Sequence, residues 1–145
     1  MRPWSHLAVA LPLAGGLYLA GGSLAMAAAA GAASVLVDVD HLADYLWLNK
    51  GRFRARSFFS DYGDHRTTKL VLLLHSWELA SLALALAWFW AAPAWIWCVL
   101  GGWFFHLACD QAFNQAGWPF YFLSYRFSKG FERSRLPCPQ DQSHP

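Results

Sequence analysis

Residues 7–37 read LAVALPLAGGLYLAGGSLAMAAAAGAASVLV and contain no charged side chain. As one straight helix these 31 residues would be about 46 Å long, well beyond the ~30 Å hydrocarbon thickness of a bilayer. Glycine pairs at 15–16 and 21–22 interrupt the stretch, and glycine favours turns and close helix packing. The sequence therefore predicts a hairpin of two helices, at about residues 5–20 and 23–45.

A second long stretch without basic residues lies between Lys69 and Arg126. It is apolar from Leu70 to about Phe113, and Pro93 interrupts it. Proline ends helices, and tryptophan favours the membrane–water interface. Four tryptophans lie around the proline: Trp88, Trp90, Trp95 and Trp97. We therefore expect a second hairpin, at about 70–92 and 94–113, and an all-α membrane protein with about four transmembrane helices.

The composition also indicates a membrane protein. The chain of 145 residues is 57% apolar and 14% charged, whereas charged residues make up about 25% of a soluble domain. A water-soluble enzyme domain is therefore largely excluded, and a net charge of +2 is too small to indicate a nucleic-acid partner. We expect a polytopic membrane domain at residues 1–130 and a flexible cytoplasmic tail at 131–145.

The basic residues predict the orientation in the membrane. They gather in a central loop and in a C-terminal segment: Lys50, Arg52, Arg54, Arg56, Arg66 and Lys69, then Arg126, Lys129, Arg133 and Arg135. By the positive-inside rule both regions lie in the cytoplasm, as do both termini of a protein in the inner (plasma) membrane. The aromatic segment 118–127 is short and contains a proline, so we expect it to lie along the interface. Four positive charges beside a membrane indicate topology or a contact with anionic lipid more often than nucleic-acid binding.

The N-terminus allows a second interpretation. Arg2, the apolar stretch 7–19 and the sequence Ala25-Met26-Ala27 resemble a cleavable signal peptide. Cleavage would remove His6 and leave an odd arrangement of spans, whereas retention gives four spans.

Acidic and histidine side chains inside membrane spans are costly and mark functional sites. Here they form three groups that the predicted topology brings to the cytoplasmic boundary, where His6 also lies. Residues three or four apart share one face of a helix, so each group can offer an imidazole and a carboxylate to one point. The groups are Asp38, Asp40 and His41, then His75 and Glu78, then His106 and Asp110.

This set of side chains is what a hydrolytic metal site requires. Neutral imidazoles and carboxylates without a thiolate pair favour Zn²⁺, with Mn²⁺ or Fe as alternatives, and the number of candidate ligands leaves room for two metals. A single histidine such as His75 is more often a hydrogen-bonded packing residue, and the grouping is what favours ligation. Asp44, Asp61 and Asp64 are expected to be surface charges.

The order of these motifs resembles the YdjM-like family of inner-membrane metal-dependent hydrolases. The motifs that carry the resemblance are Ser5-His6-Leu7, Val37-Asp38-Val39-Asp40-His41, His65-Arg66-Thr67, His106-Leu107-Ala108-Cys109-Asp110 and Tyr125-Arg126-Phe127. The resemblance covers residues 5 to about 130 and implies a hydrolase with a role for His65 as acid or base. In the family, the motif that begins here with His65-Arg66-Thr67 has a second histidine five residues after the first, where this chain has Leu70. Either His75 replaces that histidine after a longer spacing, or the ligand is lost.

The sequence therefore predicts a membrane-bound metal-dependent hydrolase with a site at the cytoplasmic interface. An anionic phosphoester or a lipid-linked molecule suits that location as substrate, with membrane lipids as further partners and Arg66 as the clamp for the anion. Glu78 is a ligand or general base. The alternatives are a metal-ion carrier, which would need polar residues through the depth of the membrane, and a non-catalytic adaptor that binds a partner through the basic loop. The predicted metal ligands are His6, Asp38, Asp40, His41, His75, His106 and Asp110.

Overall fold

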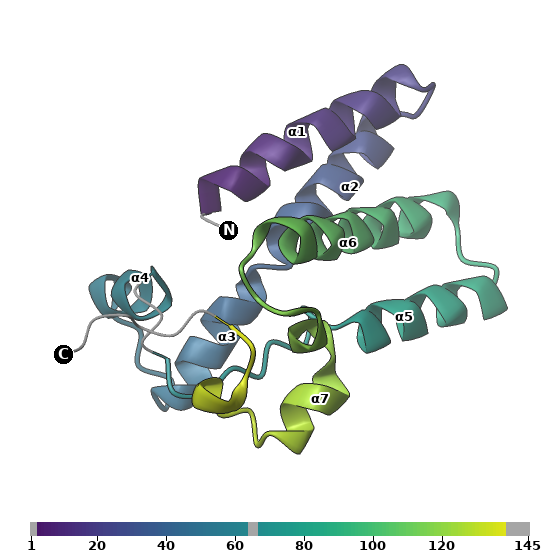
Figure 1. Ribbon diagram of the computed structural model, residues 1–145. Helices are drawn as coiled ribbons and strands as arrows, with labels where there is room; N and C mark the ends of the chain where they lie inside the picture. The colour runs from purple at the N-terminus through teal and green to yellow at the C-terminus, as the bar shows by residue number, and fades with distance from the viewer. Residues whose placement is uncertain (1–2, 64–66, 139–145) are drawn as a thin grey trace. The chain divides into compact units, whose positions relative to one another are not determined.

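The computed structural model describes the backbone of residues 3–63 and 67–138, and the side chains of 8–60 and 67–138 (Figure 1). These residues are helical without any strand, which confirms the all-α prediction, and an isolated antiparallel bridge joins Lys69 to Glu132. The chain forms two compact units. Unit 1 comprises Met1–Val37 and Trp77–Asn114, and unit 2 comprises Asp38–Ser76 and Gln115–Pro145.

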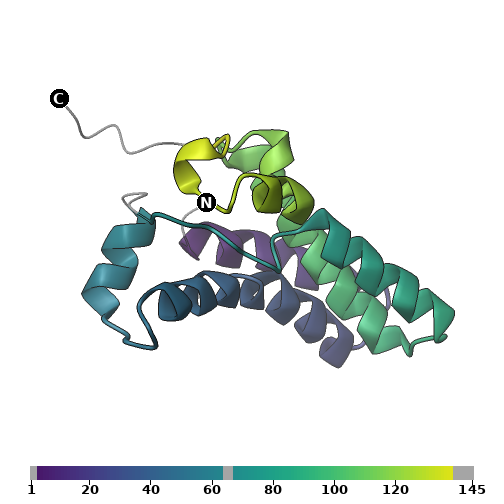
Figure 2. The same cartoon turned by 90° about the horizontal axis from the view of Figure 1, so that it is seen from below.

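Unit 1 consists of two helical hairpins, which Figures 1 and 2 show side by side. The helices are α1 (Pro3–Leu19), α2 (Leu24–Leu36), α5 (Trp77–Phe89) and α6 (Ala94–Phe113). Helix α2 lies against both α1 and α6, and α5 packs on α6. The two hairpins predicted from the sequence are therefore present. The observed end of α2 and the observed start of α5 differ from the predicted ones.

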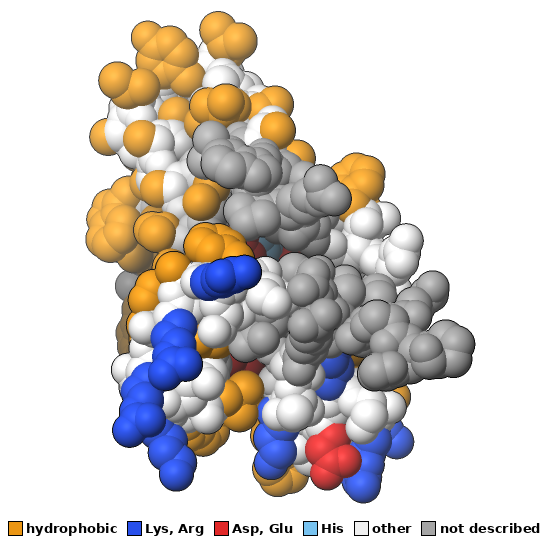
Figure 3. All heavy atoms as spheres, turned by 90° about the vertical axis from the view of Figure 1, so that its left-hand side faces the viewer, with side chains coloured by type: hydrophobic (Ala, Val, Ile, Leu, Met, Phe, Trp, Pro, Cys, Tyr) orange, Lys and Arg blue, Asp and Glu red, His pale blue; other side chains and the backbone are white. Residues whose placement is uncertain are grey.

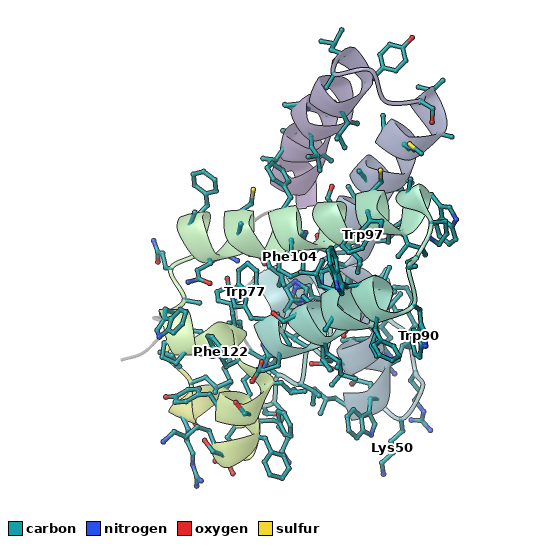
Figure 4. All side chains as sticks on the ribbon, turned by 90° about the vertical axis from the view of Figure 1, so that its right-hand side faces the viewer. Lys50, Trp77, Trp90, Trp97, Phe104 and Phe122 are labelled. Carbon is teal, nitrogen blue, oxygen red and sulfur yellow. The ribbon has the colours of Figure 1, made fainter. Side chains whose placement is uncertain are left out.

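The turns of both hairpins follow from their local sequence. Gly21 has a φ of +92°, a left-handed conformation that glycine adopts without strain, and Ser23 then caps α2 by accepting a hydrogen bond from the amide of Met26 at 3.2 Å. Pro93 precedes α6, and the indole Nε1 of Trp97 donates to the carbonyl of Ala92 at 3.1 Å (Figure 4). The indole thus satisfies a carbonyl just beyond the end of α5, which fixes the turn.

Small side chains make the contacts between the helices of unit 1. Ala27 and Ala30 of α2 and Ala80 of α5 are buried. At the crossing of α2 and α6, Gly102 lies against the backbone of Ala30, and a Cβ on Gly102 would collide with the Ala30 carbonyl oxygen. Close approach of this kind requires glycine at the contact.

Replacing Gly102 with alanine is expected to destabilise unit 1 by about 1–3 kcal/mol, because the added Cβ forces α2 and α6 apart. The measurement is the thermal unfolding midpoint of the detergent-purified protein. The control is Gly101→Ala, since a Cβ on Gly101 meets nothing within 4 Å. Equal midpoints for the two variants would contradict the close crossing.

Unit 2 combines short helices with an extended segment at residues 67–76. The helices are α3 (Val39–Leu48), α4 (Ala55–Gly63), the 3-10 turn η1 (Trp118–Tyr121), α7 (Leu123–Ser128) and the 3-10 turn η2 (Arg133–Arg135). The extended segment pairs with the C-terminal part of the unit. Leu70 donates its amide hydrogen to the carbonyl of Phe131 at 2.9 Å, and Arg133 donates to Thr68 at 3.0 Å.

Two helix predictions were wrong. The helix predicted from residue 70 begins at Trp77, because the amide groups of the preceding residues bond to carboxylates of α3 and Leu72 takes a left-handed conformation with a φ of +47°. The helix predicted over 23–45 is interrupted by a turn at Val37 and Asp38, between α2 and α3. His75 and Glu78 therefore do not share a helix face, since His75 precedes α5 and Glu78 lies in its first turn.

The predicted tail begins at residue 131, but part of it is folded. Leu136 and Arg133 are buried in unit 2, and the guanidinium of Arg133 donates to the hydroxyl of Thr67 at 3.2 Å. The rest of the predicted tail, residues 139–145, lies outside the described residues.

Among the described residues, one helical stretch, Leu24–Leu48, which runs through α2 and α3, is long and apolar enough to cross a membrane. Two shorter apolar helices are Ala8–Leu19 and Trp77–Phe89. The four spans and their orientation stay predictions.

Candidate metal centre

The start of α3 places an imidazole beside a carboxylate. Asp38 precedes α3, and His41 follows three residues later, on the same face of the turn. The Nε2 atom of His41 lies 3.7 Å from Oδ1 of Asp38, and both side chains are about one third exposed or less. This neighbourhood confirms the pairing predicted from the spacing of the two residues.

His75 joins this pair from the extended segment of unit 2. Its Nε2 atom lies 3.6 Å from Oδ1 of Asp38, and its ring centroid lies 4.8 Å from that of His41. One potential ligand atom from each of Asp38, His41 and His75 falls within 4.8 Å of the others. The three side chains form the group that we call the α3 cluster.

Asp40 holds His75 from the other side of its ring. One carboxylate oxygen, Oδ2, lies 3.3 Å from Nδ1 of His75 and accepts the amide hydrogens of Leu74 at 2.5 Å and of His75 at 3.3 Å. A carboxylate accepts hydrogen bonds, so the imidazole donates from Nδ1 to Asp40, and its Nε2 faces Asp38. Asp40 was predicted as a ligand, and that role stays a prediction. In the structure its Oδ2 contacts Nδ1 of His75, which is how a carboxylate commonly orients a metal-bound histidine.

The segment that carries His75 is held on both sides of its backbone. Asp44, one turn after Asp40 on α3, accepts the amide hydrogens of Val71 at 2.7 Å and Leu72 at 3.1 Å through Oδ2. The guanidinium of Arg126, which is fully buried, donates to the carbonyls of Leu72 at 2.8 Å and His75 at 3.0 Å. The carboxylates of α3 thus bind the amides of this segment, and Arg126 of α7 binds its carbonyls.

Arg126 also ties this segment to η1. It donates to the carbonyl of Phe120 at 3.0 Å, and its guanidinium carbon lies 5.5 Å from the centre of the Phe120 ring. The planar guanidinium offers several donors in a fixed arrangement, which suits a residue that must bind three separate carbonyls.

Unit 1 contains a second imidazole and carboxylate pair, His106 and Asp110 on α6. Both side chains are buried, and Nε2 of His106 lies 3.6 Å from Oδ2 of Asp110. The Nδ1 atom of His106 lies 2.6 Å from the carbonyl oxygen of Ser34 in α2 and therefore donates its hydrogen to it. This pair, predicted from the four-residue spacing, is confirmed.

His75 in unit 2 and His106 in unit 1 have the same kind of surroundings. In His75 and in His106, Nδ1 donates to a fixed oxygen, and Nε2 lies 3.6 Å from a carboxylate oxygen. Ligand atoms around a tetrahedral zinc ion, at bonds near 2.1 Å, lie about 3.4 Å apart. The donors fit a divalent ion in chemistry and in spacing, so the His/Asp groups could hold a metal ion; the identity of the metal is a separate question.

The other predicted site residues have different outcomes. Glu78 lies in the first turn of α5, in unit 1, and is half-buried. His6 lies in α1, but its side chain is outside the described ones, and His65 and Arg66 lie outside the described residues altogether. The roles predicted for these four residues stay predictions.

Two residues of this region were not predicted in their observed roles. Asp44 was expected to be a surface charge, but it is buried, with 5% exposed, because it binds the amides of the extended segment. Its four-residue spacing from Asp40 was the signal, since it places both carboxylates on one face of α3. Arg126 was interpreted as a topology signal, but it is fully buried because it binds the carbonyls of Leu72, His75 and Phe120.

A hydrogen bond between Trp77 and Gln111 joins α5 to α6, next to the His106 and Asp110 pair in the sequence. The indole Nε1 of Trp77 donates to Oε1 of Gln111 at 2.6 Å, and the Trp77 ring lies 5.7 Å from that of Phe104, toward which it points in Figure 4. Gln111 directly follows Asp110, so this bond fixes the part of α6 that carries the carboxylate.

Comparison of the chain with protein-family models, with curated proteins and with solved structures finds no match.

Proposed function

We propose that this chain is a multi-pass membrane protein and a metal-dependent hydrolase, whose substrate is a phosphoester or a lipid-linked molecule at the cytoplasmic face. The observation that carries the proposal is the orientation of His75: Asp40 fixes its Nδ1, and its Nε2 lies 3.6 Å from Asp38. A histidine fixed in this way is prepared to bind a metal ion, because no ring rotation or change of tautomer is needed.

The distribution of apolar side chains in unit 1 supports insertion in a membrane. Apart from Leu100 and Leu107 of α6, the described apolar side chains that are buried in its helices are alanines, whereas many large apolar side chains are exposed. Soluble proteins bury such side chains, and membrane helices instead pack through small residues and expose large ones to lipid. The most exposed include Leu19, Leu24, Trp88, Phe89 and Phe113, each at least two thirds exposed.

Partial exposure of the α3 cluster supports catalysis over a purely structural metal. The side chains of Asp38 and His41 are 27% and 30% exposed, while that of His75 is 2% exposed. Catalytic metal sites keep a position for water or substrate, whereas structural sites are closed.

The predicted chemistry follows from these residues. A bound divalent ion would supply a Lewis acid and a water of lowered pKa for hydrolysis of a phosphoester. Asp40 contacts Nδ1 of His75 at 3.3 Å and so orients the ring with Nε2 toward Asp38. Glu78 is proposed as the general base and Arg66 as the residue that binds the anionic substrate, both from the sequence.

The test is the metal content of detergent-purified protein, measured by elemental analysis for the wild type, Asp38→Ala and His106→Ala. We expect stoichiometric Zn²⁺, Mn²⁺ or Fe in the wild type and a loss in both variants, because each lacks one candidate ligand. The control is Glu132→Ala. It removes a partly exposed carboxylate that belongs to neither His/Asp group, so this variant should keep its metal.

The amount lost also tests the prediction that both groups belong to one metal site. Loss of all metal in each variant would support a shared site, and loss of part of it would support separate ones. Wild-type protein that is folded but binds no metal, even after the three ions are resupplied, would overturn the proposal. A chromogenic phosphoester, assayed with the metal-loaded wild type and both variants, then tests hydrolysis.

A further inference from the structure

Unit 2 displays cations and aromatic rings together from the end of α3 into the first part of α4. We call residues 50–59 the basic–aromatic surface. Its four cations, Lys50, Arg52, Arg54 and Arg56, are all exposed. Figure 3 shows Lys and Arg side chains gathered along the left edge of the face that it presents. Phe53 is 53% exposed and Phe59 is 64% exposed, so apolar rings lie among the cations.

This surface is folded and anchored to α3. Tyr45 is buried, and its hydroxyl donates to the carbonyl of Arg54 at 3.3 Å. Its ring contacts Phe53 and Phe58 edge-on, at centroid distances of 6.0 and 5.3 Å. Because the rings fix the backbone from within, the segment presents its cations outward without the entropy cost of ordering a flexible loop.

Gly51 turns the chain at the end of α3, directly after Lys50, the first cation of the surface. Gly51 has a φ of +78°, and its amide donates to the carbonyl of Leu46 at 2.7 Å, which closes the end of the helix. The side chain of Lys50 points away from the ribbon in Figure 4. The surface thus begins directly after the last turn of α3.

The position of the surface next to an apolar helix suggests its partner. The stretch Leu24–Leu48, which could cross a membrane, ends two residues before Lys50. Cations in that position lie at the level of lipid headgroups, and exposed phenylalanine rings suit the boundary between headgroups and acyl chains. Nucleic-acid recognition needs no apolar helix beside the cations, so the observations favour lipid.

We propose that the basic–aromatic surface binds the headgroups of anionic phospholipids. This inference rests on the membrane insertion in the proposed function and is independent of the metal. Each cation near an anionic membrane contributes about 1 kcal/mol, which corresponds to about a fivefold change in affinity. Three cations together therefore account for roughly a hundredfold preference at low salt.

The experiment titrates full-length protein in a neutral detergent with phosphatidylglycerol or phosphatidylcholine and measures retained lipid by native mass spectrometry. The test variant replaces Arg52, Arg54 and Arg56 with glutamine. The control variant replaces Lys69, Lys129 and Arg135 with glutamine, which removes the same charge from elsewhere in unit 2. Metal content is measured in the same preparations, so a failed metal site is seen separately from a failed lipid site.

We expect the wild type and the control to prefer phosphatidylglycerol and the test variant to lose that preference, by roughly a hundredfold at low salt. Equal binding of both lipids by the wild type would overturn the proposal. So would an equal loss in test and control variants, because net charge would then explain the binding. A single-stranded RNA that displaces the lipid from the wild type at equal concentration would assign the surface to nucleic acid instead.

Discussion

Replacing Arg126 with methionine is expected to destabilise unit 2 by about 3–5 kcal/mol. The arginine is fully buried and donates to the carbonyls of Leu72, His75 and Phe120. Methionine fills much of the same volume but donates no hydrogen bond, so three carbonyls lose a partner in a site with little access to water. Arg126→Lys should recover part of the loss, since it keeps the charge but not the planar arrangement of donors.

The measurement is the unfolding midpoint of the detergent-purified protein. Arg135→Met is the matched control, because the Arg135 side chain is 62% exposed and pairs with Glu132 at 2.7 Å. An exposed ion pair contributes about 0–1 kcal/mol, so this variant should unfold almost like the wild type. If both methionine variants unfolded at the same point, Arg126 would not hold the extended segment as described.

Replacing Asp40 with asparagine is expected to weaken metal binding by about 10–100-fold, the usual effect of losing the group that orients a metal-bound histidine. The carboxylate is the acceptor for Nδ1 of His75, and an amide would bind that hydrogen more weakly and could instead present its own NH₂ group. Asp40→Ala should have the same effect on the metal and an added cost in stability of about 1–3 kcal/mol for each amide that it leaves without an acceptor.

Asp44→Asn is the matched control for this prediction. It makes the same chemical change one helical turn later, at a carboxylate whose Oδ2 accepts the amide hydrogens of Val71 and Leu72. Competition with a chromophoric chelator gives the affinity for Zn²⁺, and thermal unfolding of the metal-free protein gives the stability. Equal losses of affinity in the two asparagine variants would show that Asp40 acts through general stability, not by orienting His75.

Local sequence was sufficient to predict the two hairpins of unit 1 and, in both units, the pairs set by helical spacing. The turn at Gly21 and the start of α6 after Pro93 depend on the conformations of those residues themselves. Asp38 with His41 and His106 with Asp110 follow from helical spacing and need no tertiary information. These are the parts of the candidate site that were predicted from the sequence.

The segment that carries His75 could not be predicted in this way. Its run of leucine and valine favours a helix, and the pattern gave one from residue 70. Its observed conformation depends on carboxylates 27 to 35 residues earlier and on an arginine 51 residues later than His75. Hydrogen bonds over such separations override local preference, and no local pattern reveals them.

The bonds of Arg126 also constrain the order of events during synthesis. His75 is translated 51 residues before the arginine that holds its carbonyl. A nascent chain that ends before Arg126 contains every residue of the α3 cluster but lacks the donor that fixes the backbone at Leu72 and His75. Because chains fold as they emerge from the ribosome, the cluster reaches its final form only after α7 has been made. The proposed metal ion would therefore be loaded late in the maturation of this protein, once its C-terminal region is complete.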